Sequence, residues 1–512
     1  MKRVVAPGCG LLDALEAGPC NGDDLEILTD SPPSARVPFC HPRRALYRRM
    51  SAPSSPTLAA RLAEFAASLH PESIPAAAFE RAKLHVLDAL GTALAASTCD
   101  FADVSAAALH SLGETGEYPV IGRSERLPLR DAMLQNGVLV HGLDFDDTHG
   151  ASVVHCSASA VPLMLGVGQR CGVSGRAALT AYLLAVEIDA RLGAVARGTL
   201  QKRGWHPTGI IGAFGCAAAA GHLLGASSRG IADALGITLS MASGNLEFLN
   251  DGAWTKRLHP GWAAVAGYTA AAYGQAGFVG PAQAFEGRFG LYRMLLDDPA
   301  PDLSGVLEGL GSQWAIFDNG FKPYPACHFL HAFIDCARHC RALPGFDLAA
   351  IDHIEALIHP DQIAIVCEPV AAKLAPQSPY DAQFSLQFCV AATLRLGDFG
   401  LDELEPAALS DVATLALAQK VRWQPDPASR YPASYSGALR IYLKNGHVLE
   451  AREAINRGAA ENPLGPEDVM RKFRRNADRC RALSSSDALI AAVMGLDTAP
   501  NLAALTHAMV AR

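Results

Sequence analysis

The chain has 512 residues, of which half are hydrophobic and 18% are charged, and its formal net charge is −8 at pH 7. This length suffices for two or three domains, and this composition is typical of a packed globular protein rather than a disordered one. The acidic balance provides no broad basic surface, so we expect no nucleic-acid partner.

The first 54 residues differ in composition from the rest of the chain. Prolines at 32, 33, 38, 42 and 53 interrupt any periodicity, and four arginines lie between 43 and 49. This pattern predicts a disordered extension over residues 1–54, within which Met50 is an alternative start of translation. The apolar run at the N-terminus is too short for a signal peptide, and the most apolar stretch, 210–224, is too short to span a bilayer. We therefore expect no membrane segment.

Helical periodicity begins after this extension. Leu58, Leu62, Phe65 and Leu69 recur at helical spacing. Further alanine-rich helices are predicted at about 104–113, 130–141, 158–171, 175–196, 208–224, 228–243, 260–277 and 281–296. No segment of this region shows a strand pattern as clear as the helical periodicity. Residues 55–318 are therefore expected to form one all-helical domain, completed by helices in 460–512.

The pattern changes between residues 319 and 459. Apolar residues alternate over 353–359 and again over 439–443, which is typical of strands, and a helix is expected around 382–396. Asn445-Gly446 follows the second run and predicts a hairpin in which both turn residues have positive φ. The predicted fold class is therefore mainly α, with a large all-helical domain and a smaller α+β domain, here called the lid.

The cysteines give no disulfide framework, because the thirteen are scattered and odd in number. This favours a reduced, cytoplasmic location. One group, Cys327, His328, His331, Cys336, His339 and Cys340, contains possible zinc ligands. It lacks a paired C-x-x-C, and Cys336 and Cys340 have helical spacing beside apolar residues, so we interpret them as buried helix residues and expect no metal.

Residues 141–157 read HGLDFDDTHGASVVHCS and contain three carboxylates and three histidines. Apolar helical sequence flanks this segment on both sides. A solvated surface loop is one interpretation of the segment. A polar loop between buried helices is also a common way to build an acid–base site, and this second interpretation makes Asp144, Thr148 and His155 candidate site residues.

Three further segments combine basic or histidine side chains with a restricted backbone: 202–209, 254–261 and 321–328. Their candidate ligand-binding residues are His206, Lys256, Arg257, His259, Lys322, Tyr324 and His328. The alternatives are helix capping by Thr208, an exposed basic turn and a structural linker, respectively. The chain lacks the motifs typical of nucleotide-binding, serine-nucleophile and zincin sites.

These four segments, in this order, resemble the MmgE/PrpD family. HGLDFDDTH, RGWHPTGIIGAFGCAAAAG, WTKRLHPGWAA, KPYPACHFLHAFID and AQFSLQF carry the resemblance, which extends from about residue 55 to 500. The resemblance implies an all-helical domain with an α+β lid, a homodimer, no cofactor and a small polycarboxylate substrate.

The resemblance also implies roles for individual residues. Asp144 and Thr148 would shape the substrate site, His155 would be a site histidine, and Lys256 would neutralise a substrate carboxylate. His328 would be the general acid–base, since imidazole titrates near neutral pH. The chain departs from many relatives at Gln383, where a basic residue is common, and at Phe388, where several carry tyrosine.

The chemistry implied by the resemblance is proton transfer at a carbon next to a carboxylate. We expect foremost a hydro-lyase similar to 2-methylcitrate dehydratase. The alternatives are a carboxy-lyase similar to cis-aconitate decarboxylase and an isomerase similar to iminodisuccinate epimerase, because one constellation of residues serves all three reactions. A carboxylate-binding relative that has lost catalysis is the alternative outside enzymes.

Overall fold

The secondary structure is mostly helical, and the predicted fold class is confirmed. The structure is a computed structural model that describes residues 55–113, 115–298, 300–431 and 434–511. The extension predicted over residues 1–54 lies outside the described residues. None of the described helices is long and apolar enough to cross a membrane.

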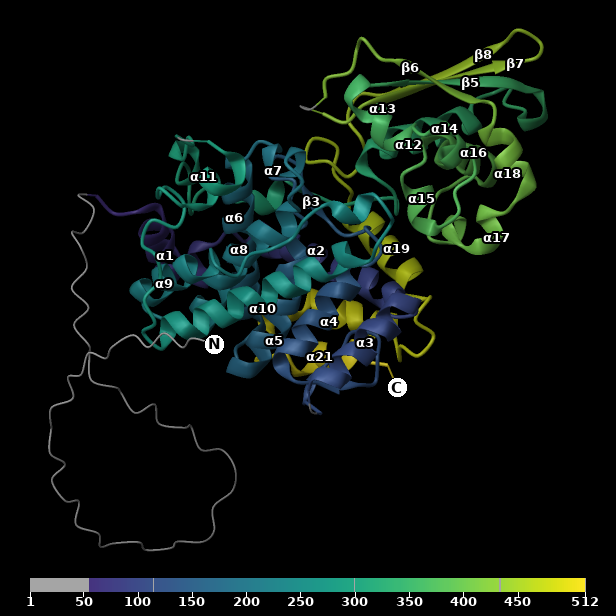
Figure 1. Cartoon of the computed structure of the whole chain (residues 1–512). Coiled ribbons are helices and arrows are strands. Elements are labelled where there is room, and N and C mark those ends of the chain that lie inside the picture. The colour runs from purple at the N-terminus through teal and green to yellow at the C-terminus, as the bar shows by residue number, and fades with distance from the viewer. Residues whose placement is uncertain (1–54, 114, 299, 432–433, 512) are drawn as a thin grey trace, which may run out of the picture. The chain divides into compact units, whose positions relative to one another are not determined.

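The larger part of the fold is built from helices around a central apolar helix (Figure 1). Its helices are α1 (Leu58–Ser68), α2 (Ala76–Ala96), α3 (Asp100–Leu112), α4 (Leu129–His141), α5 (Cys156–Cys171), α6 (Gly175–Val195), α7 (Thr199–Lys202), α8 (Pro207–Leu223), α9 (Ser228–Thr238), α10 (Thr255–Gln275) and α11 (Leu291–Leu296). Helix α8 is central because its glycines and alanines let neighbouring helices approach closely. A Cβ atom at Gly267 of α10 would lie 2.6 Å from the Ala217 nitrogen.

A second close approach, between α4 and α10, positions the site. A Cβ atom at Gly137 would lie 2.3 Å from the Cα atom of Gly261, so these helices meet backbone to backbone. Helix α4 ends at His141, where the carboxylate-rich segment begins, and α10 begins next to Lys256. The glycine pair therefore brings together two segments that are more than a hundred residues apart in the sequence.

Three of the predicted helix boundaries are wrong. Helix α10 begins at Thr255 rather than near 260, so Pro260 lies inside the helix instead of in its first turn. Helix α9 ends at Thr238 rather than 243. Residues 281–290 form turns, and only Leu291–Leu296 is helical. Ala284, Phe285 and Leu291 are nevertheless buried, because a compact turn can present apolar residues to the core as a helix does.

The lid contains one four-stranded sheet with helices packed against it (Figure 1). The strands β5 (Ile351–Ile358), β6 (Val421–Pro425), β7 (Gly437–Leu443) and β8 (Val448–Glu453) have the order β6-β5-β7-β8. The lid helices are α12 (His328–Ala342), α13 (Pro360–Val366), α14 (Val370–Leu374), α15 (Pro379–Gln383), α16 (Leu386–Leu396), α17 (Pro406–Leu409) and α18 (Val412–Ala418). The antiparallel β7–β8 hairpin is present as predicted. Its turn differs from the prediction: Gly446 has a positive φ but Asn445 does not, because four residues rather than two separate the strands.

The last helices of the chain return to the larger part. The apolar residues of α19 (Pro466–Ala477), α20 (Ser486–Met494) and α21 (Ala503–Ala508) belong to the same buried cluster as those of α2 and α6. A second large cluster fills the lid. Both clusters lie within one compact unit, residues 53–512, so the domain boundaries drawn from the sequence stay a prediction.

Two pairs of short strands lie outside the lid sheet. β1 (Tyr118–Pro119) pairs with β2 (Arg126–Leu127) within the larger part. β3 (Thr148–His149) pairs with β4 (Asn319–Gly320), and this second pair connects the larger part to the start of the lid. The β3–β4 pairing places the carboxylate-rich segment directly beside the chain that leads to Lys322. Three of the four segments singled out in the sequence thus converge at one place.

Candidate functional site

Asp144 is the centre of the site. Lys256 approaches one carboxylate oxygen, with its Nζ 2.8 Å from Oδ2, and Lys322 approaches the other, with its Nζ 2.8 Å from Oδ1. Lys322 Nζ also donates to the Asp144 carbonyl oxygen at 2.8 Å. Burial opposes ionisation, but the two ammonium groups outweigh it and hold the pKa of Asp144 well below its usual range. One carboxylate between two lysines leaves a local excess of one positive charge.

The backbone at Asp144 is strained. Its φ is +50°, in the left-handed region that residues other than glycine rarely adopt. Such strain persists only where the surroundings enforce it, and it is concentrated at functional sites. Here the two lysines and the end of α4 hold the side chain in place, so the strain serves to direct a carboxylate at two ammonium groups.

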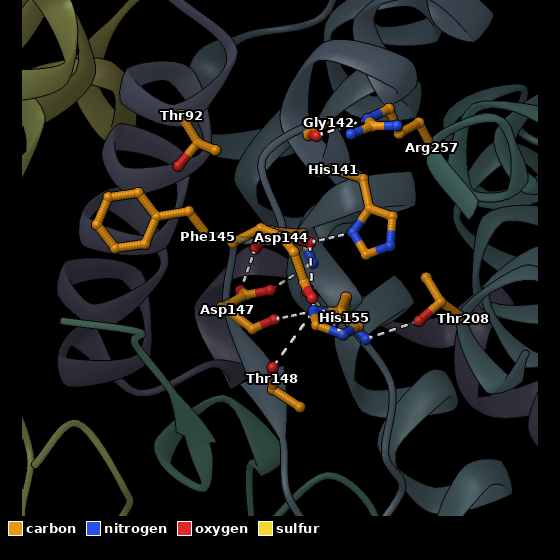
Figure 2. A network of polar contacts seen from close by, with 12 residues as sticks. Thr92, His141, Gly142, Asp144, Phe145, Asp147, Thr148, His155, Thr208 and Arg257 are labelled. Carbon is orange, nitrogen blue, oxygen red and sulfur yellow. Dashed lines mark hydrogen bonds and ion pairs between the residues drawn. The ribbon is translucent and has the colours of Figure 1, made fainter. Parts of the chain in front are cut away.

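His155 faces the same carboxylate from the start of α5 (Figure 2). Its Nδ1 lies 2.8 Å from the Asp147 carbonyl oxygen, 3.3 Å from Thr148 Oγ1 and 3.4 Å from Asp146 Oδ2. A carbonyl oxygen only accepts hydrogen bonds, so Nδ1 carries a proton and donates it to Asp147. Nε2 lies 4.0 Å from Asp144 Oδ1. The second ring nitrogen of His155 therefore faces the centre of the site.

The other two carboxylates of the segment, those of Asp146 and Asp147, are buried, and neighbouring polar side chains bind them. Asp146 Oδ2 accepts a hydrogen bond from His141 Nδ1 at 2.8 Å. Burial lowers the pKa of His141 to about 4, so this pair is a carboxylate with a neutral imidazole. Asp147 is bound by His85 at 3.0 Å, by the Asn319 amide at 2.7 Å and by Ser157. These contacts hold the loop that presents Asp144 and His155.

His328 is the first residue of α12 and lies on the lid side of the site. Its ring packs against those of His331 and Tyr435, with centroids 4.8 Å and 5.8 Å away. Burial, His331 and Lys322 together lower the pKa of His328 well below its usual value. The free protein therefore holds a neutral imidazole near Lys322, which takes up a proton only when further negative charge is placed beside it.

The remaining sequence-predicted residues lie around this centre rather than in it. His206 and His259 form a pair, with their Nδ1 atoms 2.9 Å apart, and His206 stacks on His141. Burial lowers the pKa of His259 to about 4. Thr208, considered as a helix cap, instead accepts a hydrogen bond from the His155 N–H at 3.1 Å.

Arg257 and Tyr324 direct their polar groups away from Asp144. Arg257 donates from Nε to the Gly142 carbonyl oxygen at 2.8 Å (Figure 2). Its guanidinium also lies over the Phe101 ring. The Tyr324 hydroxyl donates to Asp335 and accepts from Arg338 at 2.8 Å. In the structure, Arg257 thus supports the backbone before Asp144, and Tyr324 belongs to the lid behind Lys322.

The described residues contain one group with metal-ligand geometry, and it differs from the cysteine–histidine group considered in the sequence. Cys336 and Cys340 are buried in the apolar cluster of the lid. His141, Asp146 and His155 have candidate ligand atoms within 4.8 Å of one another. The Nδ1 atom of His155 already faces a carbonyl oxygen, and that of His141 faces Asp146, so hydrogen bonds account for this arrangement.

Sequence reasoning missed Tyr380 and the role of Gln383, both on α15. The Gln383 side-chain amide donates to the Leu143 carbonyl oxygen at 2.8 Å, next to Asp144, and the main-chain carbonyl of Gln383 accepts from the Cys327 N–H at 2.8 Å. The Tyr380 hydroxyl is buried and has no hydrogen-bond partner among the residues that the structure describes. Burial and Asp144 raise the pKa of Tyr380 above its usual value, so the hydroxyl keeps its proton. The AQFSLQF motif was the signal that this segment belongs to the site.

The comparisons with known proteins assign this buried acid–base site, set in a helical fold with an α+β lid, to a family of lyases. The chain belongs to the MmgE/PrpD family: the model of its N-terminal domain matches residues 60–304, and that of its C-terminal domain matches residues 324–498.

Several characterised relatives share most of their length with this chain. It is 29% identical to cis-aconitate decarboxylase of Mus musculus over 446 residues, which cover 83% of this chain and 88% of the relative. It is 28% identical to cis-aconitate decarboxylase of Homo sapiens, with 83% and 89% covered. The enzyme of the same name from Aspergillus terreus is 23% identical, with 87% and 94% covered.

Proposed function

We propose that this protein is a carboxy-lyase that decarboxylates cis-aconitate or a closely similar tricarboxylate. The observation that carries the proposal is that the ammonium groups of Lys256 and Lys322 both meet Asp144, with the imidazole of His155 facing the same carboxylate. The names of the relatives support decarboxylation. The 2-methylcitrate dehydratase activity that the sequence resemblance placed first stays a prediction.

The reaction requires charge neutralisation and one proton. When CO₂ leaves, the electron pair of the broken C–C bond stays on the carbon skeleton, where it develops beside the remaining carboxylates. Ammonium groups stabilise that charge most strongly in a buried site. Lys256 has N–H groups beyond the one that meets Asp144, so it can hold a substrate carboxylate, and His328 or His155 delivers the proton that completes the product.

A trianionic substrate would also change the protonation of the site. In the free protein His328 is neutral because burial, His331 and Lys322 disfavour its charged form. Carboxylates placed beside it would favour the imidazolium form and thereby supply the proton that the carbanion needs. Substrate binding and proton uptake would then be coupled.

Lys256→Ala is expected to raise KM by about 10- to 100-fold, because a hydrogen bond between an ammonium and a carboxylate is lost. The measurement is steady-state kinetics with cis-aconitate. Lys202→Ala removes an exposed lysine of α7 and serves as the matched control. An unchanged KM in Lys256→Ala would contradict a role for this lysine in binding a carboxylate.

Tyr380→Phe is expected to lower kcat/KM by about tenfold without lowering thermal stability. The hydroxyl is buried and unpartnered, so removing it relieves a desolvation penalty in the free protein and deletes a donor that the substrate would use. Tyr442→Phe, which removes a hydroxyl that donates to Glu355 on the lid sheet, is the control. A variant with unchanged kinetics would show that the hydroxyl does not meet the substrate.

The proposed activity is tested by incubating the purified protein separately with cis-aconitate, citrate, 2-methylcitrate and iminodisuccinate in D₂O and following each by proton NMR. Itaconate formed from cis-aconitate, with one deuteron incorporated, is the expected result. Loss of water from 2-methylcitrate would instead identify a dehydratase, and α-deuteration of iminodisuccinate without net conversion would identify an epimerase.

A homodimer, and a cytoplasmic location for it, also stay proposals. Helix α10 and the residue before it expose Trp254, Leu258, Trp262 and Tyr273, which are spaced so as to share one face. Contiguous exposed apolar side chains of this size are typical of interaction surfaces. Light scattering after size exclusion is expected to give twice the chain mass of 53.8 kDa, and a monomer mass would contradict the proposal.

A further inference from the structure

A polar cavity lies on the other side of two of the segments that form the site, those around Asp144 and Lys322. Asp144 and Lys322 meet on one side of the backbone, whereas their neighbours Phe145 and Tyr324 line a cavity of about 160 Å³. Residues 398–402 of the lid and α19 of the helical part complete its wall. The same two backbone segments therefore border the cavity and the site, but different side chains of these segments face each of them.

This cavity is basic within an acidic protein. Its charged lining residues are Arg338, Arg457, Arg471, Lys472, Arg475 and Arg479, together with Asp398, Asp402 and Asp468. Asp88 and Glu405, just outside the wall, pair with two of these six cations, so the five carboxylates leave an excess of one positive charge in a chain that carries −8. Such an excess, confined to a cavity, attracts small anions.

Part of this charge is already used in ion pairs. Arg475 meets Asp398 at 2.8 Å, and Arg479 meets Asp402 at 2.7 Å, so both link α19 to the lid. Lys472 is occupied by Asp88 at 2.7 Å and by the Phe145 carbonyl oxygen at 2.7 Å. These contacts explain how the elements of the cavity wall are joined. They leave other hydrogen-bond donors of the wall without an acceptor in the part of the chain that the structure describes.

Two buried donors in the wall lack a partner within the described residues. The Nδ2 atom of Asn476, a residue that is only 3% exposed, has no hydrogen-bond acceptor. The Nε atom of Arg457 is also buried without one. Buried polar groups in folded proteins are normally paired, so an unpaired amide and an unpaired guanidinium at one cavity indicate a missing acceptor. An oxyanion supplies several acceptor oxygens at once.

We propose that this cavity binds a small multivalent oxyanion, of the phosphate or polycarboxylate class, between Asn476, Arg457 and the arginines of α19. The bound anion bridges the lid and the helical part. Because Lys472 contacts the Phe145 backbone next to Asp144, and Tyr324 lies two residues after Lys322, occupancy of the cavity also stabilises the segments that hold the site.

The test is calorimetric titration of the full chain with inorganic phosphate and, separately, with citrate, at constant ionic strength. Arg457→Gln and Asn476→Asp are expected to raise the dissociation constant at least about tenfold, since each removes a hydrogen bond to the anion and Asn476→Asp adds a like charge. Arg474→Gln, on α19 but outside the cavity wall, is the matched control and is expected to bind as the unmodified chain does.

Binding at the lysine pair is separated from binding at the cavity by repeating the titrations in Lys256→Ala, which is expected to retain the cavity site. Phosphate binding without citrate binding would identify a phosphate site, and the reverse would identify a polycarboxylate site. Absence of both at millimolar concentrations would overturn the proposal. Equal affinity in Arg457→Gln, Asn476→Asp and Arg474→Gln would also overturn it. Unchanged circular dichroism in each variant excludes misfolding as the cause.

Discussion

Replacing His328 by alanine is expected to lower kcat by at least about 10²-fold, the usual scale for a general acid–base residue. The imidazole lies at the start of α12, and its ring packs against those of His331 and Tyr435. The variant is therefore expected to keep its thermal stability. Turnover of cis-aconitate and the melting temperature are the two measurements.

The pH dependence of the same variant gives an independent check. The pKa of His328 is lowered in the free protein and the proposed step uses its protonated form, so kcat/KM should rise as the pH falls toward that lowered pKa and level off below it. This pH dependence is expected to disappear in His328→Ala. His110→Ala, which removes a half-exposed histidine paired with Glu125, is the control. Near-normal turnover in His328→Ala would remove the residue from the mechanism.

The centre of the site was predictable because charge is rare in this chain. Three carboxylates in seventeen residues, between apolar helices, indicated an acid–base loop, and WTKRLHPGW indicated a basic segment able to bind carboxylates. The structure brings Asp144, Lys256 and Lys322 together as ion pairs. Local composition was informative here because each segment carries its charge within a few residues.

The supporting contacts were not predictable, because they join residues far apart in the sequence. His85 on α2 binds Asp147, and Lys472 on α19 binds Asp88 and the Phe145 carbonyl. In the sequence each is a single polar residue within a helical pattern, with no partner nearby. Tyr324 illustrates the converse: it lies two residues after Lys322 in the sequence, but its hydroxyl donates to Asp335 of the lid and does not meet Asp144.

The fold shows the same division between local and long-range information. Helical periodicity identified most of the helices, and alternation identified β5, β7 and β8. Helical periodicity failed at 281–290, where a turn rather than a helix buries Phe285. Periodicity reports which residues are buried, and it identifies the backbone conformation only when no other conformation buries the same residues.

Asp144→Asn is expected to destabilise the protein by about 3–5 kcal/mol, the usual cost of removing one partner from a buried ion pair. The substitution keeps the shape of the side chain but leaves the ammonium groups of Lys256 and Lys322 without their carboxylate. Chemical denaturation measures the loss, and Asp478→Asn, at an exposed position after α19, is the control.

The dependence of this loss on pH has a definite sign. The folded pKa of Asp144 is depressed, so its contribution to stability is present above the unfolded value, near pH 4, and is lost as the pH falls through the lower folded value. The difference in stability between the unmodified protein and Asp144→Asn is therefore expected to be constant near neutral pH and to shrink below about pH 4.

The double variant Asp144→Asn/Lys322→Met identifies the source of the loss. If stranded positive charge is the cause, removing one of the two ammonium groups should restore part of the stability, because Lys322 is only 3% exposed and a methionine can occupy the same space. A double variant less stable than Asp144→Asn would show that Lys322 stabilises the fold through its contact with the Asp144 carbonyl oxygen instead. A more stable double variant that remains inactive would show that the buried charge at this site is retained for catalysis at a cost to stability.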